Sequence, residues 1–175
     1  AVENGIPIVI GTTGHTEEER EYIAAAAKHI PAFYSGNMSM GIALLCNIAK
    51  QAAGMFPDAD IEIVEVHHNR KADAPSGTAL AIADAIADEM TDDAKYVYER
   101  QSVRRQREKS EIGIHAIRGG TIVGDHDVIF AGPDEVITLS HSAASRQVFA
   151  QGAVRAAMFM AGKPKGFYCM DDLFE

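Results

Sequence analysis

The stretch GIPIVIGTTGHT, residues 5–16, decides the fold class of this chain of 175 residues. Its first half is a continuous apolar run, which is typical of a strand buried on both faces of a parallel sheet. Two glycines then turn the chain, and Thr16 with Glu19 three residues later forms the capping-box pattern of a helix start. We expect that helix to run to about Ala27. Strand, glycine turn and capped helix together predict a βα unit of a parallel sheet.

Apolar periodicity and turn residues predict the remaining elements. A helix is expected over 40–55, where apolar side chains recur at helical spacing: Ile42, Leu45, Ile48, Ala49 and Ala52. Gly132-Pro133-Asp134 separates two strand-like runs and predicts an antiparallel pair. The other expected elements are strands at 32–34, 61–66, 112–117, 121–130 and 136–141, helices at 78–90 and 145–161, and a mobile polar loop at 91–111. This order predicts an α/β protein, with a mixed β-sheet that carries helices on one face and is flanked by the remnant of a parallel-sheet domain.

Composition narrows the function class. The formal net charge is −9, which argues against a nucleic-acid or anionic-membrane partner because phosphate binding needs a basic surface. No apolar run approaches the roughly 18 residues that cross a bilayer, and the start lacks the pattern of a signal peptide. Cys46 and Cys169 form no paired motif, which favours a reducing compartment. We therefore expect a cytoplasmic protein.

The polar run EVHHNRKADAPSGT, residues 65–78, carries the chemistry. A strand ends in two histidines, a loop follows with Lys71, and Ser76 or Thr78 can cap the next helix. A helix N-terminus offers free backbone N–H groups and a positive dipole end, and Gly77 lets a ligand approach the backbone. The pattern predicts an anion site for a carboxylate or phosphate beside a group that needs a proton.

Two other interpretations of this run stay open on the residues alone. A Ser-Gly-Thr at a helix start is often only a cap, in which case the chain would be a non-catalytic anion-binding or oligomerisation module. A zinc hydrolase using His67, His68 and Asp73 is the second alternative. Adjacent strand residues point to opposite faces, and the spacing matches no standard zinc pattern, so we predict no metal site.

The run at 65–79 resembles the signature E-x-H-H-x-x-K-x-D-x-P-S-G-T-A of the dihydrodipicolinate reductases, also called 4-hydroxy-tetrahydrodipicolinate reductases. Further segments are similar to the same family: GTTG at 11–14, NMSMG at 37–41, RGG at 118–120 with GDH at 124–126, and SR at 145–146 followed by Phe149. The resemblance implies an enzyme of lysine and diaminopimelate biosynthesis that moves a hydride from NADPH or NADH to a cyclic, unsaturated dicarboxylate. It also implies a homotetramer formed through the sheets of the substrate domains.

The resemblance assigns roles to particular residues. His67 would be the general acid, and Lys71 would assist the proton transfer and hold a substrate carboxylate, with His68 beside it. The helix start, Ser76, Gly77 and Thr78, would bind a substrate carboxylate. The implied cofactor-binding residues are Gly11, Thr12, Thr13, Asn37, Arg146 and Phe149.

The same resemblance divides the chain. Residues 1–37 would be the end of a Rossmann-like dinucleotide-binding domain, 38–144 the substrate-binding and oligomerisation domain, and 145–175 a closing helix and tail that return to the first domain. The family's G-x-x-G-x-M-G pyrophosphate loop does not occur in the sequence. We therefore expect the chain by itself to bind NADPH weakly and to be inactive alone. In the loop at 91–111, the basic residues at 104–109 stand where the family commonly has a G-x-x-G-x-R pattern. We expect these residues to form a solvated loop.

Overall fold

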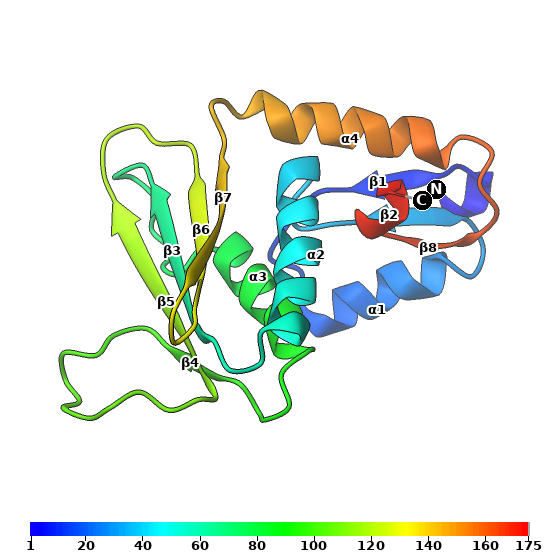
Figure 1. Cartoon of the computed structure of the whole chain (residues 1–175). Coiled ribbons are helices and arrows are strands. Elements are labelled where there is room, and N and C mark those ends of the chain that lie inside the picture. Colours follow the sequence, from blue (N-terminus) through cyan, green and yellow to red (C-terminus); the bar gives the residue numbers. More distant parts are fainter. Residues whose placement is uncertain (175) are drawn as a thin grey trace. The chain divides into compact units, whose positions relative to one another are not determined.

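The computed structural model describes residues 1–174, which form two compact units (Figure 1). Unit 1 comprises Ala1–Ala43 and the described residues from Arg146 onward, and unit 2 comprises Leu44–Ser145. No helix among residues 1–174 is long and apolar enough to cross a bilayer.

Unit 1 contains a parallel three-stranded sheet in the order β1-β2-β8. Its strands are β1 (Ile8–Ile10), β2 (Pro31–Tyr34) and β8 (Gly166–Tyr168), and its helices are η1 (Val2–Asn4), α1 (Glu17–Ala26), α4 (Gln147–Met160) and η2 (Asp171–Phe174). The expected parallel βα unit is therefore confirmed, whereas β8 was not predicted because its three residues begin with a glycine and carry no periodicity.

The predicted capping box at the start of α1 is present. The Glu19 amide donates to the Thr16 hydroxyl at 3.2 Å, and the Thr16 amide donates to the Glu19 carboxylate at 2.8 Å. These two bonds satisfy donors that the helix itself leaves unpaired. At the other end of the chain Gly162 adopts a φ of 76° just after α4, which is the expected glycine stop.

The core of unit 1 is built from buried apolar side chains on β2, the segment before α2, the start of α2, α4 and the segment after β8: Phe33, Met38, Ala43, Ala156, Met160 and Met170. Gly152 lies against the backbone of Met38, where an added Cβ would meet the carbonyl oxygen at 1.7 Å. A glycine at this position of α4 is therefore required by close packing.

Unit 2 is a mixed five-stranded sheet in the order β4-β5-β3-β6-β7. Its strands are β4 (Lys95–Val97), β5 (Glu111–Arg118), β3 (Asp60–His67), β6 (Asp125–Ala131) and β7 (Val136–Ser142). The first three are parallel, and β6 and β7 run antiparallel to their neighbours. The helices are α2 (Met40–Met55), whose first residues belong to unit 1, and α3 (Gly77–Ala87).

One face of this sheet is buried and the other is open. Along β3 the odd-numbered side chains from Ile61 to His67 are buried and the even-numbered ones are half-exposed. The register of β5 and β6 with β3 places four of their buried residues on the same face: Ile112, Ile114, Val128 and Phe130. Helix α3 supplies the buried residues Ala79, Ile82, Ala83 and Ile86, and Figure 1 shows it beside the sheet. The predicted mixed sheet with helices on one face is confirmed. We call the uncovered side the open face.

One expectation about unit 2 was wrong. The region 91–111 contains strand β4, which continues the parallel part of the sheet because Tyr96 pairs with Ile112. The loop at 104–109 is exposed as expected, except for half-buried Arg107. Two arginines of this region are nevertheless ion-paired to carboxylates of the sheet: Arg107 lies 2.8 Å from Asp60, and Arg100 lies 2.8 Å from Glu62. The sequence did not reveal these pairs because the partners lie far away along the chain.

Smaller differences concern element ends. Strand β6 begins at Asp125, four residues later than expected, because 121–124 form the turn that follows β5. Helix α3 ends at Ala87 instead of residue 90. Ile48 was expected among the packed residues of α2 but is 40% exposed.

Candidate active site

The site lies at the carboxyl end of β3, on the buried face of unit 2. Glu65 and His67 are two residues apart, so both side chains point to that face. The Nδ1 of His67 lies 2.5 Å from the Oε2 of Glu65, and the two side chains are 10% and 0% exposed. A carboxylate and an imidazole in direct contact, nearly removed from water, form the centre of the site.

Arg118, at the end of β5, completes this centre. Its two terminal nitrogens donate to the two oxygens of Glu65 at 2.7 Å each, a bidentate geometry. The Ser76 amide also donates to Glu65, at 3.0 Å. Burial alone raises the pKa of the Glu65 carboxyl, but the bonds from Arg118, His67 and the Ser76 amide outweigh it and hold that pKa below its ordinary value.

Ser76 is the N-cap of α3 and joins the helix to the site. Its hydroxyl accepts from the Ala79 amide at 3.1 Å and lies 3.3 Å from the Nε2 of His126. From the sequence, either Ser76 or Thr78 could cap the helix, and in the structure the N-cap residue is Ser76. The predicted helix N-terminus therefore opens directly beside the buried carboxylate and the histidines.

His126, on β6, pairs in register with Glu65 and is 3% exposed. Its ring contacts that of His67 edge to face, with centroids 5.2 Å apart. Burial lowers the pKa of His126 to about 4, and the charge that His67 can carry adds to this shift. His126 is thus held neutral at physiological pH.

The loop between β3 and α3 carries the remaining predicted substrate residues. Lys71 makes an ion pair with Asp73 at 2.8 Å, which lowers the pKa of that carboxyl. The Asp73 carbonyl in turn accepts from Arg118 at 2.7 Å, so the loop is fixed to β5. His68 follows His67 with a buried Nδ1 that has no hydrogen-bond partner among the described residues, and Gly77 and Thr78 form the first turn of α3.

The predicted cofactor residues all lie in unit 1. Gly11, Thr12 and Thr13 directly follow the carboxyl end of β1, and Asn37 follows that of β2. These strands are parallel neighbours, with Ile10 opposite Tyr34, so both loops leave the sheet at the same edge. Arg146 is the N-cap residue of α4, and Phe149 packs against the unit 1 core. Loops at the carboxyl edge of a parallel sheet are where dinucleotides bind in open α/β folds.

The zinc alternative finds no support in the positions of its proposed ligands. His67 is bonded to Glu65 and Asp73 to Lys71, and among residues 1–174 no three His, Cys, Asp or Glu side chains are grouped as a metal site.

Sequence reasoning gave no role to four residues that the structure brings to the site: Glu65, Arg118, Gly124 and His126. A charged residue at an inward-facing position of an alternating strand was the available signal for Glu65. Arg118, Gly124 and His126 lie in segments that resemble the family, but the sequence did not show their place in the site because Arg118 and His126 reach it by strand pairing.

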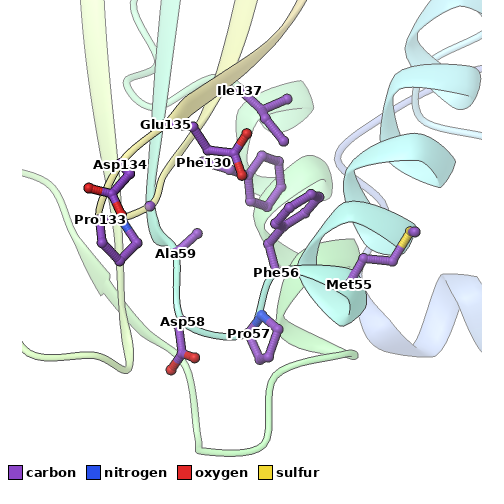
Figure 2. A pocket seen from close by; sticks show the side chains of 11 residues that line it. Met55, Phe56, Pro57, Asp58, Ala59, Phe130, Pro133, Asp134, Glu135 and Ile137 are labelled. Atoms are coloured by element: carbon purple, nitrogen blue, oxygen red, sulfur yellow. The ribbon is translucent and has the colours of Figure 1, made fainter.

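A separate pocket of about 250 Å³ lies at the other end of β3 (Figure 2). Phe56, Phe130 and Ile137 form apolar walls, and Asp58 and Asp134 lie at the rim. It adjoins the first residues of β3, whereas the Glu65 centre adjoins the last, so the two are distinct.

Comparison with known proteins then identifies the family. A family model described as Dihydrodipicolinate reductase, C-terminus, matches residues 41–174, and the corresponding N-terminus model matches residues 1–38. The chain belongs to the dihydrodipicolinate reductase family.

Individual relatives agree with this assignment. The chain is 57% identical over 173 residues to the 4-hydroxy-tetrahydrodipicolinate reductase of Caldanaerobacter subterraneus subsp. tengcongensis, covering 99% of this chain and 69% of that protein. It is 50% identical over 174 residues to the reductase of Clostridium novyi, with the same coverage of each.

A solved structure agrees as well. The dipicolinate-bound dihydrodipicolinate reductase from Paenisporosarcina sp. TG-14 matches with a TM-score of 0.76 at 29% identity, covering 96% of this chain and 64% of that one. The chain thus spans about two thirds of the length of these dihydrodipicolinate reductases.

The predicted family and fold are confirmed. So are the predicted function of a 4-hydroxy-tetrahydrodipicolinate reductase in lysine biosynthesis, the class of NAD(P)H-dependent oxidoreductase, and a small molecule as substrate. The non-catalytic module and the zinc hydrolase are not favoured.

Proposed function

We propose that unit 2 binds the cyclic dicarboxylate substrate of the family at the Glu65 centre, with His67 as the general acid. The observation that carries this assignment is the free side of the His67 ring. Its Nε2 faces Gly124, where an added Cβ would lie only 3.0 Å away. Because glycine has no side chain, a substrate atom can approach the nitrogen that Glu65 does not occupy.

The carboxylate-binding groups of the proposal lie on the segment that follows His67 in the chain. The first turn of α3 presents Gly77 and Thr78 behind the Ser76 cap, and helix N-termini bind anions. Lys71 and His68 lie on the loop that leads to this turn. The dipicolinate bound by the Paenisporosarcina protein is a ring with two carboxylates, the chemistry that such a set of donors fits.

The division of labour follows from these positions. When bound, the nicotinamide cofactor supplies a hydride to one atom of the substrate double bond. His67 Nε2 gives a proton to the other atom, and Lys71 holds a substrate carboxylate and assists the transfer. The groups proposed to hold NADPH or NADH are Gly11, Thr12 and Thr13 after β1, Asn37 after β2, and Arg146 and Phe149 at the start of α4.

The division into a dinucleotide-binding end at 1–37, a substrate-binding and oligomerisation domain at 38–144 and a returning segment at 145–175 is part of the proposal. We also propose a cytoplasmic homotetramer assembled through the open face of the unit 2 sheet. Ile117 and Val136 are apolar side chains that are 50% and 63% exposed on this face, at opposite ends of the sheet. Sedimentation of the chain with and without Val136→Glu tests the assembly.

Ligand binding tests the proposed site without depending on turnover. Dipicolinate should raise the melting temperature of the chain in anion-free buffer, with a stabilisation that follows ligand concentration over dissociation constant. Lys71→Met should abolish the shift. A control, Arg104→Ala, removes a cation of the 91–111 region and should leave the shift in place. No shift at saturating dipicolinate would overturn the assignment of this site.

A further inference from the structure

The two ring nitrogens of His67 have different surroundings. Nδ1 lies 2.5 Å from Glu65, on the same strand, while Nε2 is the atom next to Gly124. Which nitrogen carries hydrogen when the ring is neutral decides which one can exchange a proton with a ligand. That choice is set by the partner of Nδ1.

Glu65 can only accept. Its Oε1 receives the Ser76 amide at 3.0 Å and one Arg118 nitrogen at 2.7 Å, and its Oε2 receives the other Arg118 nitrogen at 2.7 Å. The carboxyl group of Glu65 is favoured in its ionised form, because the bidentate guanidinium and the amide N–H hold its pKa below the ordinary value. It is therefore ionised, and the remaining contact on Oε2 must be a hydrogen bond donated by the Nδ1 of His67.

We propose that Glu65 and Arg118 are positioning residues that fix the hydrogen of His67 on Nδ1 and so reserve Nε2 for the substrate. The inference rests on the proposed function in one respect, that His67 is the proton donor. Glu65 supplies the acceptor that selects the tautomer and a negative charge that favours the protonated ring. Neither residue needs to touch the substrate.

Arg118 has the opposite electrostatic effect from Glu65. Its guanidinium is held by both Glu65 oxygens and by the Asp73 carbonyl, and it pairs in register with His67 across β5 and β3. Its positive charge therefore weakens the pull of Glu65 on a proton at His67. The other titratable group that faces the ring is His126, from β6. Positive charge on the His67 ring is thus favoured by one carboxylate and disfavoured by one guanidinium.

The wild-type chain tests the tautomer directly. With ¹⁵N-labelled histidine, NMR at a pH at which the His67 ring is neutral should show its hydrogen on Nδ1 and no hydrogen on Nε2. Glu65→Gln should let the Nε2–H form appear, because an amide can donate to Nδ1 as well as accept. A wild-type neutral ring with its hydrogen on Nε2 would overturn the proposal without any variant.

The pH dependence of dipicolinate affinity tests the charge balance. Binding of this dianion should weaken as pH rises if it depends on positive charge at His67. Glu65→Gln should move the midpoint of the pH dependence of binding down and Arg118→Gln should move it up, because one removes a negative and the other a positive charge beside the ring. A purely structural role would lower affinity at every pH in both variants and leave the midpoint in place, which would contradict the proposal.

Matched controls keep the outcomes separable. Glu62→Gln removes a carboxylate from the same strand on the open face and should change neither tautomer nor midpoint. Arg118→Lys retains the charge and should keep the midpoint closer to wild type than Arg118→Gln does. Dipicolinate that fails to bind wild type would sink the proposed function while the NMR result still decides the tautomer. Dipicolinate that binds with midpoints unchanged in both charge-removing variants would sink the positioning role alone.

Discussion

Unit 2 contains two sets of glutamate, histidine and arginine side chains on opposite faces of strand β3. On the buried face, Glu65 contacts His67 and Arg118, and its side chain is fully buried. On the open face, Glu62 lies 2.7 Å from the Nε2 of His115 and 2.8 Å from Arg100, and its side chain is 24% exposed.

Comparison of the Glu65 set with the Glu62 set shows that residue types alone do not make an active site. In both, arginine and histidine hydrogen bonds outweigh burial and lower the pKa of the glutamate. Only the buried set adjoins a helix N-terminus, and only there does a glycine stand where a side chain would crowd a histidine nitrogen of the set. Burial also makes its charges depend on one another, because little water is present to replace a lost partner.

The largest difference between the two sets should appear in catalysis. In an enzyme that also carries the family's G-x-x-G-x-M-G loop, His67→Gln should lower the rate of substrate-dependent NADPH oxidation by about 10²–10⁴, the usual effect of losing a positioned proton donor. His115→Gln, the matching change on the open face, should keep the rate within about two-fold of wild type, since a surface substitution away from the site changes little. Steady-state assays of both variants measure the contrast. Equal losses would mean that the comparison does not locate the chemistry.

The second-largest difference between the two sets should appear in the free energy of unfolding. Arg118→Ala leaves the buried Glu65 charge without its bidentate partner and should lower the free energy of unfolding by about 3–5 kcal/mol. His115→Ala removes a half-exposed partner of Glu62, which keeps Arg100 and Arg107, and should cost about 0–1 kcal/mol. Urea unfolding at pH 7 compares them. Similar small losses would show that Glu65 recruits water or another donor when Arg118 is removed.

A smaller effect should come from pH, through the additional histidine of the buried set. His126 is neutral in the folded chain with a pKa of about 4 but binds a proton near its ordinary value when unfolded. The unfolded state therefore takes up more protons between these values, and stability falls as pH drops from about 6.5 towards 4. From pH 7 to pH 5 this amounts to about 2 kcal/mol. Urea unfolding of His126→Asn should show a flatter decline than wild type, and an equally steep decline would contradict the assignment.

Much of the fold was predictable because it depends on local chemistry. The capping box at Thr16, the glycine stop at Gly162 and the helix over Met40–Met55 are set by neighbours a few residues apart. The short strands β4 and β8 were not predictable, since three residues hold too little periodicity and each forms only by pairing with a longer strand.

The candidate site likewise has a part that the sequence predicted and a part that it did not. His67, Lys71 and the helix start at Ser76 lie within a single run of sequence, so their types and spacing were enough to predict an anion site beside a proton donor. The long-range ion pairs of residues 100–107 were missed because their partners, such as Asp60 and Glu62, belong to a strand some forty residues earlier.

What the sequence determined by itself was therefore the family and the run of residues that holds the candidate site. The tertiary structure decided which distant groups join that run. Arg118 is 53 residues from Glu65, and His126 is 50 residues from Ser76, and each arrives by the register of a strand pair. That register is fixed by burying one face of the sheet against α3, a condition that involves the whole of unit 2 at once. A local pattern can name a histidine, but only the packed sheet determines which of its nitrogens is left for a substrate.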